Sequence, residues 1–123
     1  MPTLIACLSS GKGTWTEVSK IIGAQSWSKV FLIVDNFGKE KYTPRENTEL
    51  IVVDFFTEMP LLVEQITKSL QGKITDFEVA LNFISGSGKE HMALLEAVLE
   101  LGLNFRLVML NNNGQLETLG LRV

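Results

Sequence analysis

Two short segments rich in serine and glycine, each with a lysine, contain the residue types best suited to bind an anion. The first is Ser9-Ser10-Gly11-Lys12-Gly13-Thr14, and the second is Ser85-Gly86-Ser87-Gly88-Lys89. Glycine lets backbone N–H groups approach a phosphate, hydroxyl groups donate hydrogen bonds, and lysine adds positive charge. Short turns between a strand and a helix often use the same residues, so one such segment alone is better explained as a turn. Two segments that converge in space favour a site for a phosphate-bearing ligand.

Apolar runs and helical spacing predict the elements that hold these segments. Short apolar runs predict five buried strands at residues 3–8, 29–35, 49–54, 78–84 and 104–110. Three amphipathic or helix-forming stretches predict helices at about 14–23, 57–72 and 90–101. We expect Thr14 and Thr57 to cap the first two of these helices.

The remaining residues are read as loops and one returning strand. Residues 37–47 are polar and contain Gly38 and Pro44, so we expect an exposed loop there. A tight turn at 111–114 should lead into an antiparallel edge strand over 115–123. The resulting order, β-α-β-β-α-β-α-β-β, predicts a Rossmann-like, open, mostly parallel sheet in a three-layer sandwich with a C-terminal antiparallel hairpin.

The chain length and fold class indicate where a ligand would bind. The 123 residues suit one α/β domain spanning residues 1–123. In open α/β sheets, ligands bind beyond the carboxyl ends of the strands, near the point where the strand order reverses. Both serine- and glycine-rich segments follow a predicted strand, so we expect them to meet there.

Charge and residue counts exclude several classes of function. With 11 basic and 14 acidic residues the formal net charge is −3, which argues against binding of duplex nucleic acid through a broad basic surface. Cys7 is the one cysteine and lies in an apolar run, so it predicts a buried thiol and no internal disulfide. His91 is the one histidine, so no His/Cys cluster predicts a zinc site. The apolar run at 3–8 is too short for a signal peptide or membrane span, and we expect a cytoplasmic protein.

Standard nucleotide-binding fingerprints do not match either segment. In the P-loop pattern, Ala6 occupies the position of the first glycine, and Gly13 follows Lys12 where serine or threonine is needed. In the dinucleotide pattern G-x-G-x-x-G, the third glycine is replaced by Thr16 in the first segment and by His91 in the second. Asp35, at the end of the second strand, could contact a ribose or be an exposed carboxylate, and we favour the second interpretation.

The segment from Asn82 onward resembles a known family. Residues 82–89, Met92-Ala93-Leu94-Leu95 and Leu101-Gly102-Leu103 resemble the CRISPR-associated Rossmann-fold (CARF) family, in which a strand, a Ser/Thr-Gly-Gly-Thr-Lys-like loop and an apolar helix ending in Leu-Gly follow one another. Ser9-Ser10-Gly11 matches the position of the ligand loop of that family. Here the second loop reads Ser-Gly-Ser-Gly-Lys instead. We expect this chain to hold the sensor and no attached effector domain.

The CARF resemblance implies a homodimer that binds cyclic oligoadenylate, or a related small nucleotide, across its two-fold axis. A separate effector protein would be a possible partner, and the resemblance implies no cofactor. The candidate ligand-binding residues are Ser9, Ser10, Gly11, Lys12, Thr14, Ser85, Gly86, Ser87, Gly88 and Lys89.

Some CARF proteins are ring nucleases that cleave their ligand without a metal, and for that reaction the resemblance points to Lys89 with Ser9 or Ser10. The sequence shows no clear general base, and we interpret His91 as structural or as a surface residue. Two alternatives stay open. One is a structural or regulatory dimer module without a nucleotide ligand, and the other is a generic Rossmann-like mononucleotide binder.

Overall fold

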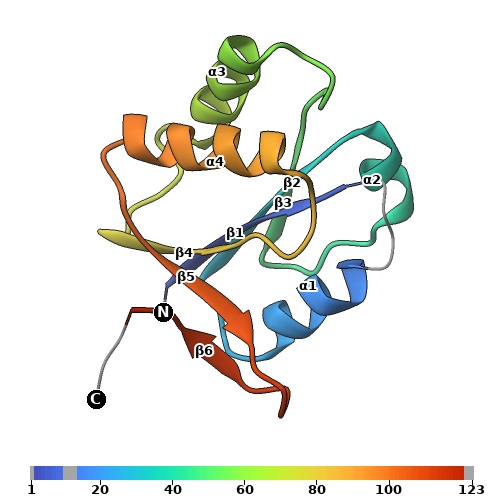
Figure 1. Ribbon diagram of the computed structural model, residues 1–123, viewed down its shortest axis with the longest axis vertical. Coiled ribbons are helices and arrows are strands. Elements are labelled where there is room, and N and C mark those ends of the chain that lie inside the picture. Colours follow the sequence, from blue (N-terminus) through green and yellow to red (C-terminus); the bar gives the residue numbers. More distant parts are fainter. Residues whose placement is uncertain (1, 10–13, 121–123) are drawn as a thin grey trace.

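Within the part of the chain that the structure describes, the fold is a six-stranded sheet with helices on both faces (Figure 1). A computed structural model describes residues 2–9 and 14–120. The strands are β1 (Thr3–Leu8), β2 (Lys29–Val34), β3 (Thr48–Val52), β4 (Glu78–Asn82), β5 (Asn104–Leu110) and β6 (Leu116–Thr118). The helices are α1 (Trp15–Gly23), α2 (Asn36–Lys41), α3 (Met59–Leu70) and α4 (Gly88–Glu100).

The strand order of the sheet is β3-β2-β1-β4-β5-β6. The first five strands are parallel, and β6 pairs antiparallel with β5. The predicted fold class is therefore confirmed. The chain winds outward from β1 in one direction through β2 and β3, and then in the other direction from β4. The switch in strand order thus lies between β1 and β4, which places a crevice at their carboxyl ends.

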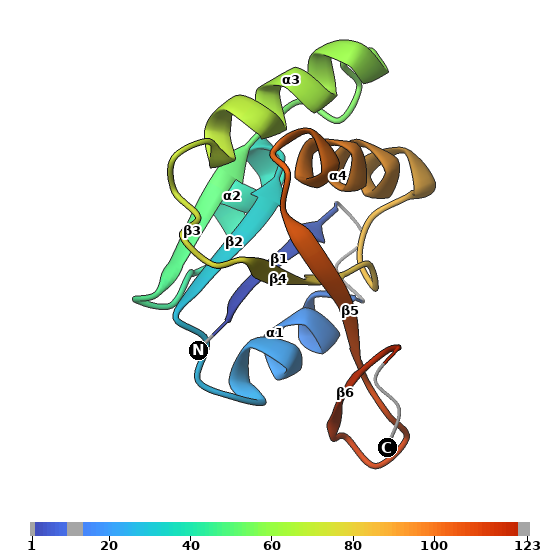
Figure 2. The same cartoon turned by 90° about the vertical axis from the view of Figure 1, so that its left-hand side faces the viewer.

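Side chains alternate between the two faces of β1 and explain why its whole length is apolar. Ile5 and Cys7 pack in the core beneath α3 and α4, whereas Leu4, Ala6 and Leu8 pack in the core beneath α1. A strand covered on both faces needs an apolar side chain at every position. Figures 1 and 2 show α3 and α4 on one side of the sheet and α1 on the other. No helix within residues 2–9 and 14–120 is long and apolar enough to cross a membrane.

One helix was missed by sequence reasoning, and the predicted loop over 37–47 is partly wrong. Asn36–Lys41 forms the short helix α2, so the observed order is β-α-β-α-β-α-β-α-β-β. The Asp35 carboxylate caps this helix by accepting a hydrogen bond of 2.8 Å from the Gly38 N–H. Gly38 is buried, and a Cβ there would lie 3.0 Å from Val34 Cβ, so the glycine lets the helix lie against β2.

Other boundaries also differ from the prediction. The strands predicted over 49–54 and 78–84 cover Thr48–Val52 and Glu78–Asn82. The N-cap of α3 is Glu58, not Thr57. Helix α4 begins at Gly88, two residues before the predicted start, because Ser87 is its N-cap. The returning strand β6 covers Leu116–Thr118 and not the longer range 115–123, of which 121–123 lie outside the described residues.

Candidate functional site

A hydrogen bond joins the two predicted loops at the switch point. The backbone N–H of Ser9, just after β1, donates to Ser85 Oγ in the loop after β4, at 3.2 Å. Ser85 is buried, although its neighbours in the sequence are more exposed. The structure therefore brings together the two loops, after β1 and after β4, that were predicted to converge. Of the predicted residues, Ser10, Gly11 and Lys12 lie outside the described residues, as does Gly13.

The loop after β4 is held in one shape by His91. A carbonyl oxygen can only accept a hydrogen bond, so His91 Nε2 donates to the Ser85 carbonyl at 2.8 Å. The His91 ring also stacks on Phe83, with 4.8 Å between ring centroids. These contacts engage the imidazole in the loop's structure, which agrees with the structural interpretation of His91.

Gly86 has a backbone conformation that this packing requires. Its φ is +104°, a region that side chains with a Cβ rarely adopt. A Cβ at this position would lie 3.1 Å from His91 Nε2 and 3.4 Å from Cys7 Cβ. The glycine thus lets the loop turn directly over the end of the sheet.

Ser87 and Glu90 fix the start of α4. The Ser87 N–H donates to Glu90 Oε1 at 3.0 Å, and the Ser87 hydroxyl donates to Glu90 Oε2 at 2.5 Å. Both polar hydrogens of Ser87 are therefore directed to a carboxylate that is itself buried. The spacing Ser87-x-x-Glu90 is a capping-box pattern, and this signal in the sequence could have placed the helix start correctly.

The start of α4 presents polar groups suited to an anion. The N–H groups of Gly88 and Lys89 lie in the first helical turn, where a helix offers no internal acceptor. The helix dipole adds partial positive charge at that end. Lys89 is partly exposed, and it forms no ion pair with any residue in the ranges 2–9 and 14–120. Its ammonium group is thus not neutralised by a described carboxylate.

Cys7 lies beneath this loop but is chemically quiet. Full burial and, to a lesser degree, the negative charge of Glu90 together raise the pKa of its thiol to about 12. At neutral pH the thiol stays protonated and is a poor nucleophile. The predicted buried thiol is confirmed.

The residues around Ser9 connect the first loop to an aromatic cluster. Trp15 Nε1 donates to the Ser9 carbonyl at 2.6 Å, which fixes the indole against the end of β1. The same ring lies 5.9 Å from Phe37 and 6.0 Å from Tyr42 between ring centroids. Thr14 is partly buried at the N-cap position of α1, as predicted.

Two polar side chains near the strand ends shape the site. Asn82 is buried at the end of β4, where its amide donates to the Val108 carbonyl at 2.7 Å and accepts the Ile84 N–H at 3.1 Å. It ties β4 to β5 just before the loop. Asp35 is half-buried and caps α2, so the interpretation of a simply exposed carboxylate is wrong.

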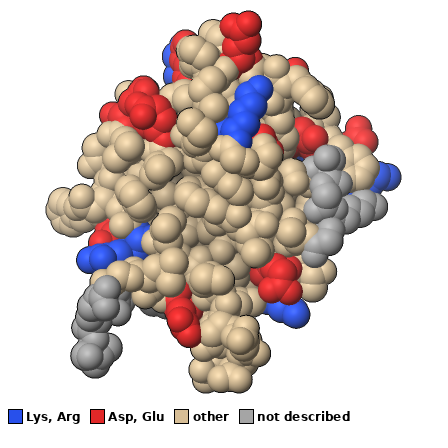
Figure 3. Space-filling model, in the orientation of Figure 1, with Lys and Arg blue, Asp and Glu red and all other residues tan. Residues whose placement is uncertain are grey.

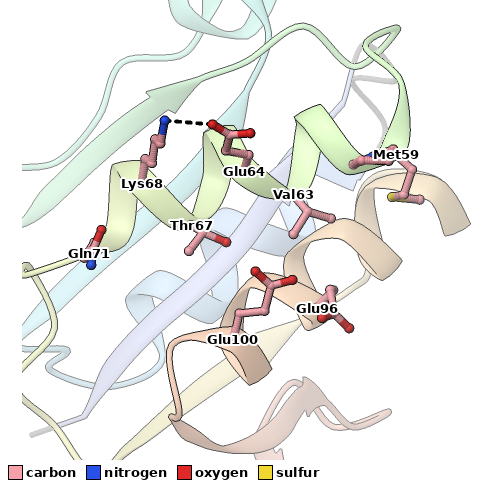
Figure 4. A pocket seen from close by; sticks show the side chains of 9 residues that line it. Met59, Val63, Glu64, Thr67, Lys68, Gln71, Glu96 and Glu100 are labelled. Carbon is pink, nitrogen blue, oxygen red and sulfur yellow. Dashed lines mark ion pairs between the residues drawn. The ribbon is translucent and has the colours of Figure 1, made fainter.

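A further hollow lies away from these loops, between α3 and α4 (Figure 4). It has a volume of about 640 Å³ and is lined by Met59, Val63 and Thr67 together with acidic residues. The pKa of the Glu100 carboxyl is raised, because its protonated form can donate a hydrogen bond to the neighbouring Glu96, as expected for two acidic groups in contact. This acidic groove repels an anion and is not a site for a phosphate-bearing ligand.

Within residues 2–9 and 14–120, no group of three or more His, Cys, Asp or Glu side chains is arranged to hold a metal ion. Among the described residues, the candidate site offers hydrogen-bond donors and Lys89 at the carboxyl ends of β1 and β4.

The comparisons with known proteins relate this chain to one architecture. No known protein-family model matches the sequence, and no curated protein matches it by sequence. Among solved structures, the chain is similar to Enterococcus italicus Csm6 bound to cyclic hexa-2'-fluoro-hexa-dAMP, with a TM-score of 0.55 and 14% sequence identity. The similarity covers 95% of this chain and 35% of the Csm6 chain, so this chain spans about a third of that protein. Csm6 is a CARF-domain protein, and the fold implied by the CARF resemblance is therefore confirmed.

Proposed function

We propose that this chain is a CARF-type sensor that binds cyclic oligoadenylate as a homodimer. The observation that carries the proposal is the hydrogen bond between Ser9 and Ser85, which joins the loops after β1 and β4 at the switch point of the sheet. The similar fold of Csm6, whose structure contains a cyclic hexa-adenylate analogue, supports the same class of ligand.

The loop after β4 supplies the groups that bind phosphate. Gly88 and Lys89 offer backbone N–H groups at the start of α4, and the Lys89 ammonium adds a full positive charge. Ser85, Gly86 and Ser87 hold these donors in place, since their polar groups or backbone conformation are engaged within the loop. From the first loop, Ser9, Ser10, Gly11, Lys12 and Thr14 complete the proposed set of ligand-binding residues.

A two-fold axis beside this loop doubles every contact and suits a symmetric cyclic ligand. It places two copies of Lys89 in one pocket, although the whole chain is acidic. The centre of the face shown in Figure 3, below α4 and toward β5, is largely free of charged side chains, which lie around it. Ile84, Met92, Leu99 and Met109 are exposed apolar side chains on these elements and near the loop. Burial of such side chains against a second copy would stabilise the dimer.

We propose binding of the ligand and not its cleavage. Cleavage by attack of a ribose 2′-hydroxyl needs a group that accepts the proton of that hydroxyl. The nearby His91 imidazole is bonded to the Ser85 carbonyl, and the Cys7 thiol is protonated and buried. Lys89, Ser9 and Ser10, which the resemblance relates to ring cleavage, here serve to hold phosphate.

Calorimetric titration with cyclic tetra- and hexa-adenylate tests the proposal. We expect one ring to bind per two chains, and sedimentation to show a dimer at the same concentration. Linear hexa-adenylate is the control for ring closure and should bind more weakly, because it must lose more conformational freedom. An absence of heat and of any thermal shift at high ligand concentration would contradict the proposal.

A further inference from the structure

A second hollow lies at the same end of the sheet as the two loops, between the ends of β2 and β3. Its volume is about 300 Å³, and it is lined by Phe37, Phe55 and Phe56 together with Asp35 and Asp54. Three of the seven phenylalanines of the chain line this one hollow. Aromatic faces beside a few polar groups are the usual lining of a small-molecule site.

Phe56 is displayed to solvent by a turn that is itself well ordered by hydrogen bonds. The Phe56 N–H donates to Asp54 Oδ1 at 2.9 Å, and the Thr57 N–H donates to the Asp54 carbonyl at 3.0 Å. The turn is thus closed around Asp54, yet 95% of Phe56 is exposed. A fixed backbone that holds an aromatic ring in water at the rim of a hollow provides a stacking surface for a planar ligand.

The hollow is connected to the phosphate-binding loops through the aromatic cluster. Phe37, in its wall, packs on Trp15, and Trp15 donates to the carbonyl of Ser9. Strands β1, β2 and β3 are consecutive neighbours in the sheet. At about 5 Å between neighbouring strands, the hollow lies roughly 5–10 Å from the end of β1, a span comparable to the length of one nucleotide.

Charge determines which part of a nucleotide suits this hollow. Asp35 and Asp54 line it, and their carboxylates repel a phosphate group. A carboxylate instead accepts hydrogen bonds from the exocyclic amino group of adenine or cytosine, which uracil lacks. Each carboxylate uses one oxygen to hold its own turn, at Gly38 and Phe56 respectively. The phosphates are directed to the Lys89 side of the sheet end, and an amino-bearing base is directed to the hollow.

We propose that this hollow, with Phe56 as its stacking face, is the nucleobase site for the ligand held by the loops after β1 and β4. The proposal rests on the proposed function and adds a preference for an amino-bearing base such as adenine. Phe56 contacts the ligand directly, whereas Asp54 also positions Phe56 through its turn.

Phe77 provides a matched control for a test of this site. It is 91% exposed, close to the value for Phe56, but it precedes β4 at the opposite end of the sheet. Titration of cyclic hexa-adenylate into the wild type, Phe56→Ala and Phe77→Ala should show about 10-fold weaker binding for Phe56→Ala, since stacking contributes roughly 1–3 kcal/mol per base. Phe77→Ala should bind as the wild type does. Both side chains are exposed, so neither substitution should impair folding.

A second measurement separates this proposal from the proposed function. Adenosine and uridine carry no phosphate, so their binding does not depend on Lys89. With phenylalanine rings isotopically labelled, adenosine should shift the Phe56 ring resonances and leave those of Phe77 in place, and uridine should shift them less. If cyclic hexa-adenylate binds but Phe56→Ala leaves its affinity unchanged, the base site is wrong and the proposed function stands. If cyclic hexa-adenylate does not bind, the proposed function fails, and Phe56 resonances unmoved by adenosine would overturn the base site as well.

Discussion

The two ends of the parallel sheet use the same residue types but hold them differently. At the carboxyl end, the loop Ser85–Lys89 has a buried serine, a crowded glycine and a lysine without a described ion-pair partner. At the amino end, Ser28 is exposed, Gly72 has open space around its Cα, and Lys73 pairs with Glu49. Composition alone does not distinguish these ends.

The difference between the ends lies in how their polar groups are used. At the amino end, charged side chains form ion pairs with one another. Lys73 and Lys29 pair with Glu49, and Arg106 pairs with Glu78. At the carboxyl end, polar groups bond to one another and hold the loop after β4 in one shape. The first turn of α4 and Lys89 face outward. A binding site needs a rigid scaffold with unused donors, and only the carboxyl end combines the two.

The largest difference in stability between the two ends should appear when Gly86, at the carboxyl end, and Gly72, at the amino end, are each replaced by alanine. Gly86→Ala and Gly72→Ala both place an alanine at positive φ, at a cost of roughly 1–2 kcal/mol each. In Gly86→Ala the new methyl also meets His91 and Cys7, which adds about 1–3 kcal/mol of overpacking. We expect unfolding free energies, measured by urea denaturation, to fall by about 2–5 kcal/mol for Gly86→Ala and by about 1–2 kcal/mol for Gly72→Ala. Equal losses would show that the loop is not packed against the sheet end.

Removal of a lysine at each end tests whether only the carboxyl end binds the ligand. A charge-assisted hydrogen bond contributes about 1.5–3 kcal/mol, so Lys89→Ala should weaken cyclic hexa-adenylate binding by about 10- to 150-fold in calorimetry. Lys73→Ala removes an exposed ion pair and should leave the affinity unchanged. Similar losses for both lysines would indicate nonspecific attraction to the surface instead of a site.

Replacement of one serine at each end, Ser85 and Ser28, should give a smaller difference in the free energy of unfolding. Ser85→Ala leaves the Ser9 N–H without its acceptor at a part-buried position, which should lower the unfolding free energy by about 1–2 kcal/mol. Ser28→Ala removes an exposed hydrogen bond to the Pro2 carbonyl and should change stability by less than about 0.5 kcal/mol. If both variants unfold like the wild type, the Ser9–Ser85 hydrogen bond does not hold the loops together.

Sequence reasoning predicted the architecture well because the strands carry strong local signals. Each strand of the sheet interior is a short, mostly apolar run that is stopped by serine, aspartate or asparagine. Helix α2 was missed because its six residues are mostly polar and too few to show a helical periodicity. It forms because Asp35 caps it and because Gly38 lets it lie against Val34, both of which depend on β2 being in place.

The position of the candidate site was predictable, but the roles of its residues were not. The convergence of Ser9 and Ser85 follows from parallel strands and a switch point, so topology alone placed it. That Ser85 and Ser87 are occupied within the loop depends on where Glu90 and Ser9 point in space. The hollow with Phe56 joins residues from two βα connections, and no local pattern in the sequence relates them.

The last prediction concerns the Cys7 thiol beneath the carboxyl-end loop, whose burial should lower the stability of the fold as the pH rises. In the folded chain the pKa of Cys7 is raised to about 12, whereas an exposed thiol has its ordinary value of 9.0. Above pH 9 the unfolded chain therefore releases a proton that the folded chain keeps, and stability falls as pH rises through this range. At pH 10 this loss should be about 1.4 kcal/mol, from about 1.4 kcal/mol per pH unit.

Comparison of wild type with Cys7→Ala isolates this loss from the titration of other groups. Urea unfolding at pH 8 and pH 10 gives the pH-dependent change for each chain, and the wild type should lose about 1.4 kcal/mol more than the variant. Cys7 packs in the core beneath α3 and α4, and Gly86 of the carboxyl-end loop lies close to its Cβ. Equal losses in the two chains would mean that the thiol titrates as an exposed one, and that the carboxyl-end loop opens far enough to admit water to the end of β1.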